Sequence, residues 1–229
     1  MNSIQKNIPF VGLHAHSTFS TFDGFGFPAE HMDRAYEHGM DALALTDHGS
    51  ANGLSYQLLH AKKMKAEGKN FKPIYGVEAY FVPSVADWRK EYDEAKLDKK
   101  RAKTLSDKKN EGSFINDEGS DRSSKRSLSR RRHLVLLAAS QKGLDNIFQL
   151  ISTSYDEEYF YRYPRMDFDL LRKHSEGVIC LSACMSGVLA AAYWQHREES
   201  DEAVLVAMRE LAAEFKDIFG DRFYGELQW

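Results

Sequence analysis

Short apolar runs alternate along this chain with longer stretches in which apolar residues recur every third or fourth position. The runs predict β-strands and the longer stretches predict amphipathic helices. The predicted strands span residues 10–16, 41–46, 73–82, 133–139, 177–184 and 222–228. The predicted helices span residues 28–38, 51–67, 141–154, 167–174, 186–198 and 201–219. Strands that alternate with helices indicate βαβ units, so we expect an α/β fold built on a parallel sheet or barrel.

The helix boundaries carry their own signals. Pro28 is at the first turn of one predicted helix, and Gly39, Gly68 and Gly220 directly follow predicted helix ends. Proline at the first helical position and glycine just past the last one are the preferred arrangement. In the second predicted helix, one apolar stripe is formed by Leu54, Leu58, Ala61 and Met64.

Residues 84–132 interrupt this rhythm. Their first half is rich in charged residues of both signs and is compatible with a charged helix, whereas their second half is rich in Ser, Gly and charge, which predicts mobility. The strand–helix alternation resumes directly afterwards, so we interpret 84–132 as an insertion within a single domain that covers residues 1–229.

Composition adds a charge asymmetry. The chain has 229 residues, 42% of them hydrophobic, which is enough for a substantial core, and its formal net charge is −3. The insertion contains 15 of the 31 Lys and Arg residues but only 10 of the 34 Asp and Glu residues. A basic insertion on an acidic body fits either a contact with nucleic acid or a solvated loop.

The two cysteines and the apolar runs indicate the compartment. Cys180 and Cys184 lie too far apart in one strand to form a disulfide, so a reducing environment is expected. The first ten residues lack the apolar run of a signal peptide, and no stretch approaches the ~20 apolar residues of a membrane span. We therefore predict a cytoplasmic protein with no membrane association.

Metal-binding side chain types stand where the apolar runs begin or end. Because catalytic groups in parallel barrels gather at the carboxyl ends of the strands, we expect these side chains to meet at one rim. Imidazole nitrogen and carboxylate oxygen together suit zinc, manganese or iron. The candidate ligands are His14, His16, Asp23, His48, Glu78, His133 and Cys184.

The first two histidines form the most informative pair. His14 and His16 are separated by one residue of a predicted strand, so both face the same side and are able to bind one ion. Asp23 follows a loop that is able to fold back over them. The alternative for an isolated pair of this kind is chance occurrence.

Asp47, His48 and Glu78 are the predicted catalytic residues. One division of labour makes His48 a ligand and Asp47 a group that orients an imidazole. The alternative is an Asp that forms the turn before Gly49, beside a histidine bonded elsewhere. Glu78 lies inside an apolar strand, where a carboxylate without a cation is costly, and metal bridging would remove that cost.

His133 and Cys184 are weaker candidates by themselves. His133 opens an apolar strand and is also compatible with a simple strand-edge histidine. A buried structural role is the commoner fate of a cysteine, and we expect it for Cys180. Cys184 ends its predicted strand beside the expected site, which favours a ligand.

Together these motifs resemble a known family. HAHSTFSTFDG, ALTDHG, PIYGVEAYF, HLVLLAASQKGLDNIFQLIS, CLSACMSG and FYGELQ are similar, in this order, to the PHP (polymerase and histidinol phosphatase) domain of bacterial DNA polymerase III alpha subunits. The resemblance covers nearly the whole chain outside 84–132. It implies a distorted seven-stranded (β/α) barrel with up to three divalent metal ions, and the seven candidate ligands match the family's motif positions.

The resemblance also carries expectations about activity. It implies metal-dependent phosphoesterase and 3′–5′ exonuclease capacity on DNA, within a longer chain that is a DNA-directed DNA polymerase and contacts other replisome subunits. The family's further Asp-x-His motif lies on a last strand beyond Trp229, so we expect this chain to lack that strand. Two alternatives remain: a non-catalytic scaffold that binds a separate proofreading exonuclease, and a small-molecule phosphatase of the histidinol-phosphate type.

Overall fold

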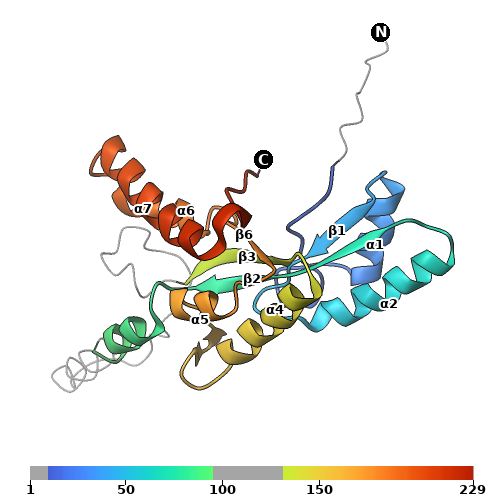
Figure 1. Cartoon of the computed structure of the whole chain (residues 1–229), viewed down its shortest axis with the longest axis horizontal. Coiled ribbons are helices and arrows are strands. Elements are labelled where there is room, and N and C mark those ends of the chain that lie inside the picture. Colours follow the sequence, from blue (N-terminus) through green and yellow to red (C-terminus); the bar gives the residue numbers. More distant parts are fainter. Residues whose placement is uncertain (1–9, 95–130, 229) are drawn as a thin grey trace, which may run out of the picture.

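The computed structural model describes residues 10–94 and 131–228, and within them it shows an α/β fold (Figure 1). The main sheet has five strands in the order β1-β2-β3-β6-β7. They are β1 Ala42–Leu45, β2 Lys72–Phe81, β3 Arg132–Ala138, β6 Val178–Leu181 and β7 Phe223–Tyr224. The helices are α1 Pro28–Glu37, α2 Asn52–Ala66, α4 Gln141–Ser154, α5 Phe168–Lys173, α6 Val188–His196, α7 Asp201–Phe219 and the short 3₁₀ helix η2 Gly220–Arg222. These bounds confirm every helix listed from the sequence to within two residues.

The α/β fold class is confirmed, but the sheet is mixed and is not parallel throughout. β1 and β2 are parallel, as are β6 and β7, but β3 runs antiparallel to both β2 and β6. β3 starts opposite the end of β2, with Arg132 paired to Phe81. The chain thus leaves and re-enters the sheet at the same rim, which requires no crossover helix.

β2 organises the sheet because it has a different neighbour along each half. Its first half pairs with β1 up to Tyr75, and its second half pairs with β3 from Gly76 onward. A Cβ atom at Gly76 would lie 2.6 Å from the carbonyl oxygen of Leu136. Glycine at this position therefore allows β3 to approach β2 closely.

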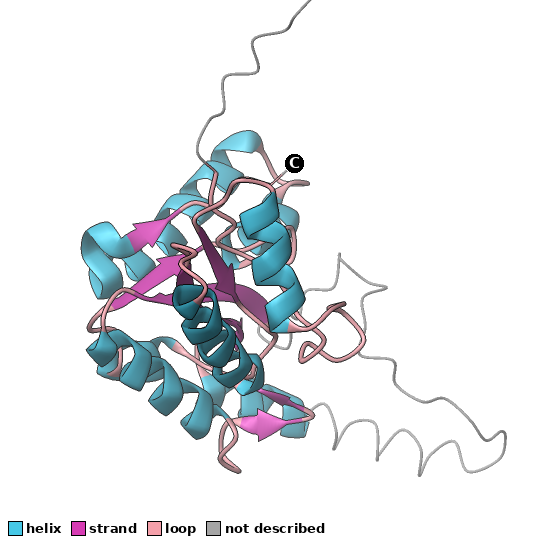
Figure 2. Cartoon of the chain, turned by 90° about the vertical axis from the view of Figure 1, so that its right-hand side faces the viewer, coloured by secondary structure: helices cyan, strands magenta, loops and turns pink. Residues whose placement is uncertain are grey.

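Alternation along β2 separates a helix-covered face from an inner face. Val77, Ala79 and Phe81 belong to the main apolar cluster, which the helices α4, α5, α6 and α7 cover. Glu78 and Tyr80 alternate with them and therefore face the other side. Figure 2 shows helices arranged around the strands at the centre of the molecule.

Two predicted strands are much reduced. Residues 10–16 form no strand, and only Gly12 makes an isolated parallel bridge, to Leu43 of β1. The segment is still tied to β1, since the N–H groups of Ala44 and Thr46 donate to the carbonyl oxygens of Gly12 and Ala15. The predicted strand 222–228 has only the two residues of β7 in β-conformation. A small hairpin, β4 Phe160–Tyr161 with β5 Tyr163–Pro164, was not predicted.

The insertion begins as a packed helix. Residues 85–94 are helical, which confirms the expected helix at its start. Trp88 is only 2% exposed, stacks on Tyr92, and lies 3.8 Å below the guanidinium carbon of Arg165. The predicted mobile half of the insertion lies outside the described residues, except for Arg131 and for Arg132, which is the first residue of β3.

The two edges of the sheet approach each other on its inner side. His14, in the segment beside β1, and Glu226, just after β7, are 2.7 Å apart between Nδ1 and Oε1. Residues 10–14 and 224–228 both line a cavity of about 1190 Å³. The described part of the chain thus forms a curved, incompletely closed sheet in place of a complete seven-stranded barrel. Among the helices described, none is long and apolar enough to cross a membrane.

Candidate metal centre

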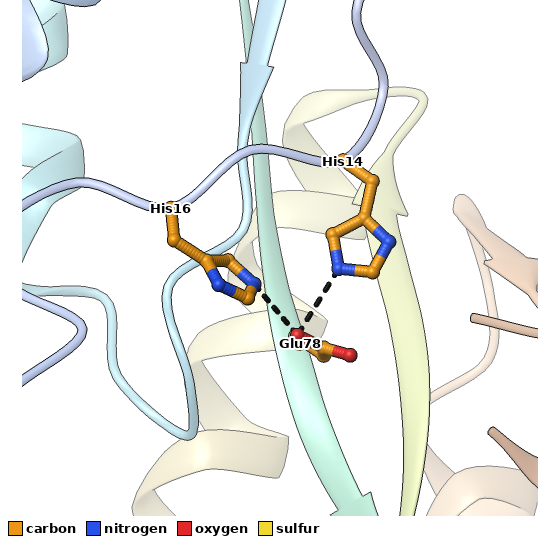
Figure 3. Close-up of side chains that lie close together, drawn as sticks. All are labelled: His14, His16 and Glu78. Atoms are coloured by element: carbon orange, nitrogen blue, oxygen red, sulfur yellow. Dashed lines mark ion pairs between the residues drawn. The ribbon is translucent and has the colours of Figure 1, made fainter. Parts of the chain in front are cut away.

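Glu78 is at the centre of the site. It lies in the interior of β2 on the inner face of the sheet and is only 1% exposed. Its Oε2 atom is 3.0 Å from Nε2 of His14 and 2.6 Å from Nε2 of His16 (Figure 3). The same-face geometry expected for the two histidines is therefore present, although their segment is not a regular strand.

His48 and Asp23 extend the cluster on one side. Parallel pairing continues past β1 through an isolated bridge between His48 and Glu78, which brings His48 Nδ1 to 3.4 Å from Glu78 Oε2. Asp23 Oδ2 contacts Nδ1 of His16 and lies 3.7 Å from Nε2 of His48. The loop thus folds back over the histidines, as its position in the sequence predicted.

His133 and Cys184 extend the cluster on the other side of Glu78. His133 Nδ1 is 3.0 Å from Glu78 Oε1, and Cys184 Sγ is 3.6 Å from the same imidazole nitrogen. His133 is near the amino end of β3, not at a carboxyl end as expected, and it reaches the rim because β3 is antiparallel. A left-handed backbone at Ala183, with φ of 58°, reverses the chain just before Cys184.

The seven predicted ligand residues are thus brought together, and six of them form three overlapping groups. In each group the ligand atoms lie within 4.8 Å of one another. The groups are His14, His16 and Glu78; His16, Asp23 and His48; and His48, Glu78 and His133. A tetrahedral ion with bonds of about 2.0–2.2 Å holds its ligands roughly 3.5 Å apart, so these spacings are compatible with metal binding.

Unsatisfied atoms in the middle of the cluster support the same assignment. His16 Nε2, His48 Nδ1 and Glu78 Oε2 are buried and have no hydrogen-bond partner. His16 Nε2 and Glu78 Oε2 are close together, but not in the geometry of a hydrogen bond. Buried polar atoms are normally satisfied, and converging lone pairs of this kind are satisfied by a cation. The residues present therefore fit divalent metal ions.

The protonation of the cluster is strongly perturbed. Burial lowers the pKa of His14, but hydrogen bonds to Glu226 and Glu78 outweigh it and raise the pKa to about 10. Burial likewise opposes protonation of His133, yet Cys184 and Glu78 raise its pKa to about 9. Burial lowers the pKa of His48 to about 4. The surrounding imidazoles overcome burial at Glu78 and hold its pKa far below the usual range.

Asp47 does not have the expected role. It is buried, and its two carboxylate oxygens accept hydrogen bonds from the N–H group of Ser17 (2.6 Å) and the hydroxyl group of Ser17 (2.9 Å). Among the described contacts, Asp47 orients no imidazole. It instead anchors the loop that follows His16, and the sequence pattern alone did not distinguish these two partners.

Two contacts of the cluster were missed by sequence reasoning. Glu226 bonds Nδ1 of His14 on the side away from Glu78, and Gln228 Nε2 lies 3.1 Å from the same nitrogen. A carboxylate behind a ligating histidine fixes its tautomer and ring orientation. The signal available in the sequence is a Glu and a Gln within the predicted strand 222–228.

An α/β sheet with a half-buried cluster of histidines around the buried Glu78 defines a domain with a candidate metal site, and sequence comparison specifies which kind. A family model for the PHP domain matches residues 12–229, and the chain belongs to this family.

The relatives are similar over nearly all of this chain. DNA polymerase III subunit alpha of Aquifex aeolicus is 37% identical over 219 residues, which cover 96% of this chain and 15% of the relative. The same subunit of Borreliella burgdorferi is 33% identical over equal shares of the two chains. The chain therefore spans about a seventh of the length of these relatives.

A solved structure from Bifidobacterium adolescentis, provisionally assigned as a metal-dependent phosphoesterase, is more distant. It is 10% identical with a TM-score of 0.42, over 88% of this chain and 74% of its own.

Proposed function

We propose that this PHP domain is a metal-dependent phosphoesterase that removes nucleotides from the 3′ end of DNA, as part of a DNA polymerase III alpha chain. The observation that carries the proposal is the convergence of unsatisfied ligand atoms on Glu78 Oε2. The seven ligand types of the family's motifs are all retained, which argues against the non-catalytic scaffold. The polymerase, its other domains, DNA and further replisome subunits are the partners that this proposal implies.

The chain's own residues have distinct tasks in this proposal. Glu78 and the imidazoles around it hold the ions, which we expect to be zinc, manganese or iron and up to three in number. Bound divalent ions stabilise the charge that develops on phosphate oxygens during phosphoester cleavage. His48 stays neutral near pH 7, because burial lowers its pKa to about 4, and is therefore available as a ligand or proton acceptor.

The same proposal implies a cellular compartment for the protein. Cys180 and Cys184 are both free thiols, and Cys180 is fully buried. Unpaired cysteines are the usual state in a reducing compartment. We accordingly place the activity in the cytoplasm.

The test is nucleotide release by the chain loaded with zinc, manganese or iron. Single-stranded DNA labelled at its 5′ end should shorten from its 3′ end, and Glu78→Gln should abolish both the shortening and most of the bound metal. Glu158→Gln, which changes an exposed glutamate, is the matched control. No shortening with any of the three metals, or equal shortening by Glu78→Gln, would contradict the proposal. Hydrolysis of histidinol phosphate without shortening of DNA would favour the small-molecule phosphatase.

A further inference from the structure

Arg131 is a cation beside the metal cluster that the cluster itself does not use. It precedes β3 and is separated from His133 by one residue, so the two side chains extend toward the same side. Its guanidinium carbon lies 3.7 Å from the ring centre of Tyr163 and 5.1 Å from that of Tyr80. Two tyrosine rings therefore hold the guanidinium group in place.

Tyr80 connects this arginine to the cluster. Its ring is parallel to the imidazole of His48, with centres 5.3 Å apart, and its centre is 5.6 Å from that of His133. Arg131 is thus one aromatic ring away from two of the candidate ligands. Tyr80 itself is buried.

The arginine lacks a counter-charge in the described part of the chain. No ion pair joins it to a described carboxylate, and its Nε atom is buried without a hydrogen-bond partner. The cluster contains the carboxylates of Glu78 and Asp23 as well as imidazoles, and divalent ions bound there would repel the arginine. An anion bound to the arginine would remove this repulsion.

The shape of the guanidinium group indicates which kind of anion it binds. A guanidinium presents parallel N–H donors that match two oxygens of a phosphate or carboxylate, and stacking on an aromatic ring orients it in advance. We propose that Arg131 binds the phosphate group of the phosphoester substrate at the edge of the metal cluster. This inference rests on the proposed function, because it is that function which brings a phosphate to the site.

The neighbouring residue provides a matched control. Arg132 pairs with Phe81 on the opposite face of the sheet and lines a separate cavity of about 650 Å³ with Val188 and Glu214. Arg131→Gln and Arg132→Gln therefore remove the same charge at adjacent positions on different faces. Arg131→Lys retains the charge but loses the planar fork.

The experiment titrates inorganic phosphate into the manganese-loaded chain by calorimetry, with metal content measured for each variant. Arg131→Gln should weaken phosphate binding by about ten-fold or more, since a charge-assisted hydrogen bond is lost. Arg132→Gln should bind phosphate like the parent chain, and Arg131→Lys should be intermediate, all with unchanged metal content. In hydrolysis of a phosphoester, Arg131→Gln should raise KM more than it lowers kcat.

Each other outcome is decisive. Equal phosphate affinity in Arg131→Gln and Arg132→Gln, or no phosphate binding by the parent chain, overturns the inference. Equal loss of metal in Arg131→Gln and Arg131→Lys would show that the arginine only supports packing, which also overturns it. Phosphate binding that depends on Arg131 in a chain that hydrolyses no phosphoester would refute the proposed function and leave this binding site standing.

Discussion

Glu226 illustrates how much a single residue outside the ligand set contributes. It holds His14 from the side away from Glu78, so that Nε2 of His14 is directed at the cluster. We expect Glu226→Gln to weaken metal binding by about 10–100-fold, the usual cost of removing such a partner. Competition with a fluorescent metal chelator measures the effect. Glu158→Gln should leave the affinity unchanged, and equal affinities in all three proteins would show that His14 needs no such support.

Protonation of the same imidazoles sets a pH dependence. With pKa values of about 10 and about 9, His14 and His133 are protonated near pH 7 in the metal-free chain, so a metal ion must displace their protons. Metal affinity should therefore increase as pH rises from 6 toward about 9. Calorimetry in buffers of different ionisation enthalpy would show proton release on binding. An affinity that is constant across this range would contradict these protonation states.

The stability of the metal-free chain should change with pH in the opposite direction to the metal affinity. A raised histidine pKa stabilises the fold fully below the ordinary value of 6.5, and this contribution is lost as pH rises through about 9–10. Alkaline pH should thus weaken the empty fold while it favours the metal-bound one. Thermal midpoints of the two forms from pH 6 to about 10 would reveal the divergence.

At the scale of elements, the contact between β2 and β3 positions His133. Gly76→Ala would place a Cβ atom 2.6 Å from both the carbonyl oxygen of Leu136 and a side-chain carbon of Leu137. We expect a loss of about 1–3 kcal/mol in unfolding free energy and weaker metal binding, because β3 must shift away. Gly225→Ala is the control, as its added Cβ meets no atom within 4 Å. Equal unfolding free energies, measured with denaturant, would argue against this close approach.

Helix α2 shows which buried positions the apolar periodicity predicts and which it does not. Leu54, Ala61 and Met64 are buried as predicted, but Leu58 is 42% exposed. Gln57 is fully buried in its place, and its Nε2 atom donates to the carbonyl oxygens of Leu43 and Ile74. Hydrophobic pattern alone does not anticipate a polar side chain that bonds two strands of the sheet.

For the molecule as a whole, bound metal should connect segments that are distant in sequence. The candidate ligands come from the amino-terminal segment, the turn after β1, β2, β3 and the turn after β6. Removal of metal with a chelator should lower the thermal midpoint by roughly 5–10 °C, since a ligand bound only to the folded state stabilises that state. The double variant His14→Ala, His16→Ala should start from a low midpoint and respond little to the chelator. A parent chain that is insensitive to the chelator would show that the cluster carries no structural metal.

The sequence by itself determined the helices, the longer strands, the candidate ligand residues and the family. Periodicity of apolar residues is local, so α1, α2, α4 and α7 were predicted nearly to the residue. The candidate ligand residues were also recognisable, because most of these polar side chains interrupt or border an apolar run.

Only the tertiary structure decided how these parts are joined. A strand that is apolar throughout has the same pattern in either direction, so the antiparallel course of β3 was not visible in the sequence. His14 and Glu226, which are in contact, are 212 positions apart in the sequence. Asp47 accepts a hydrogen bond from Ser17 and contacts no imidazole among the described residues, because the loop after His16 brings Ser17 next to it. Such contacts depend on how the sheet curves in space, which local residue patterns do not encode.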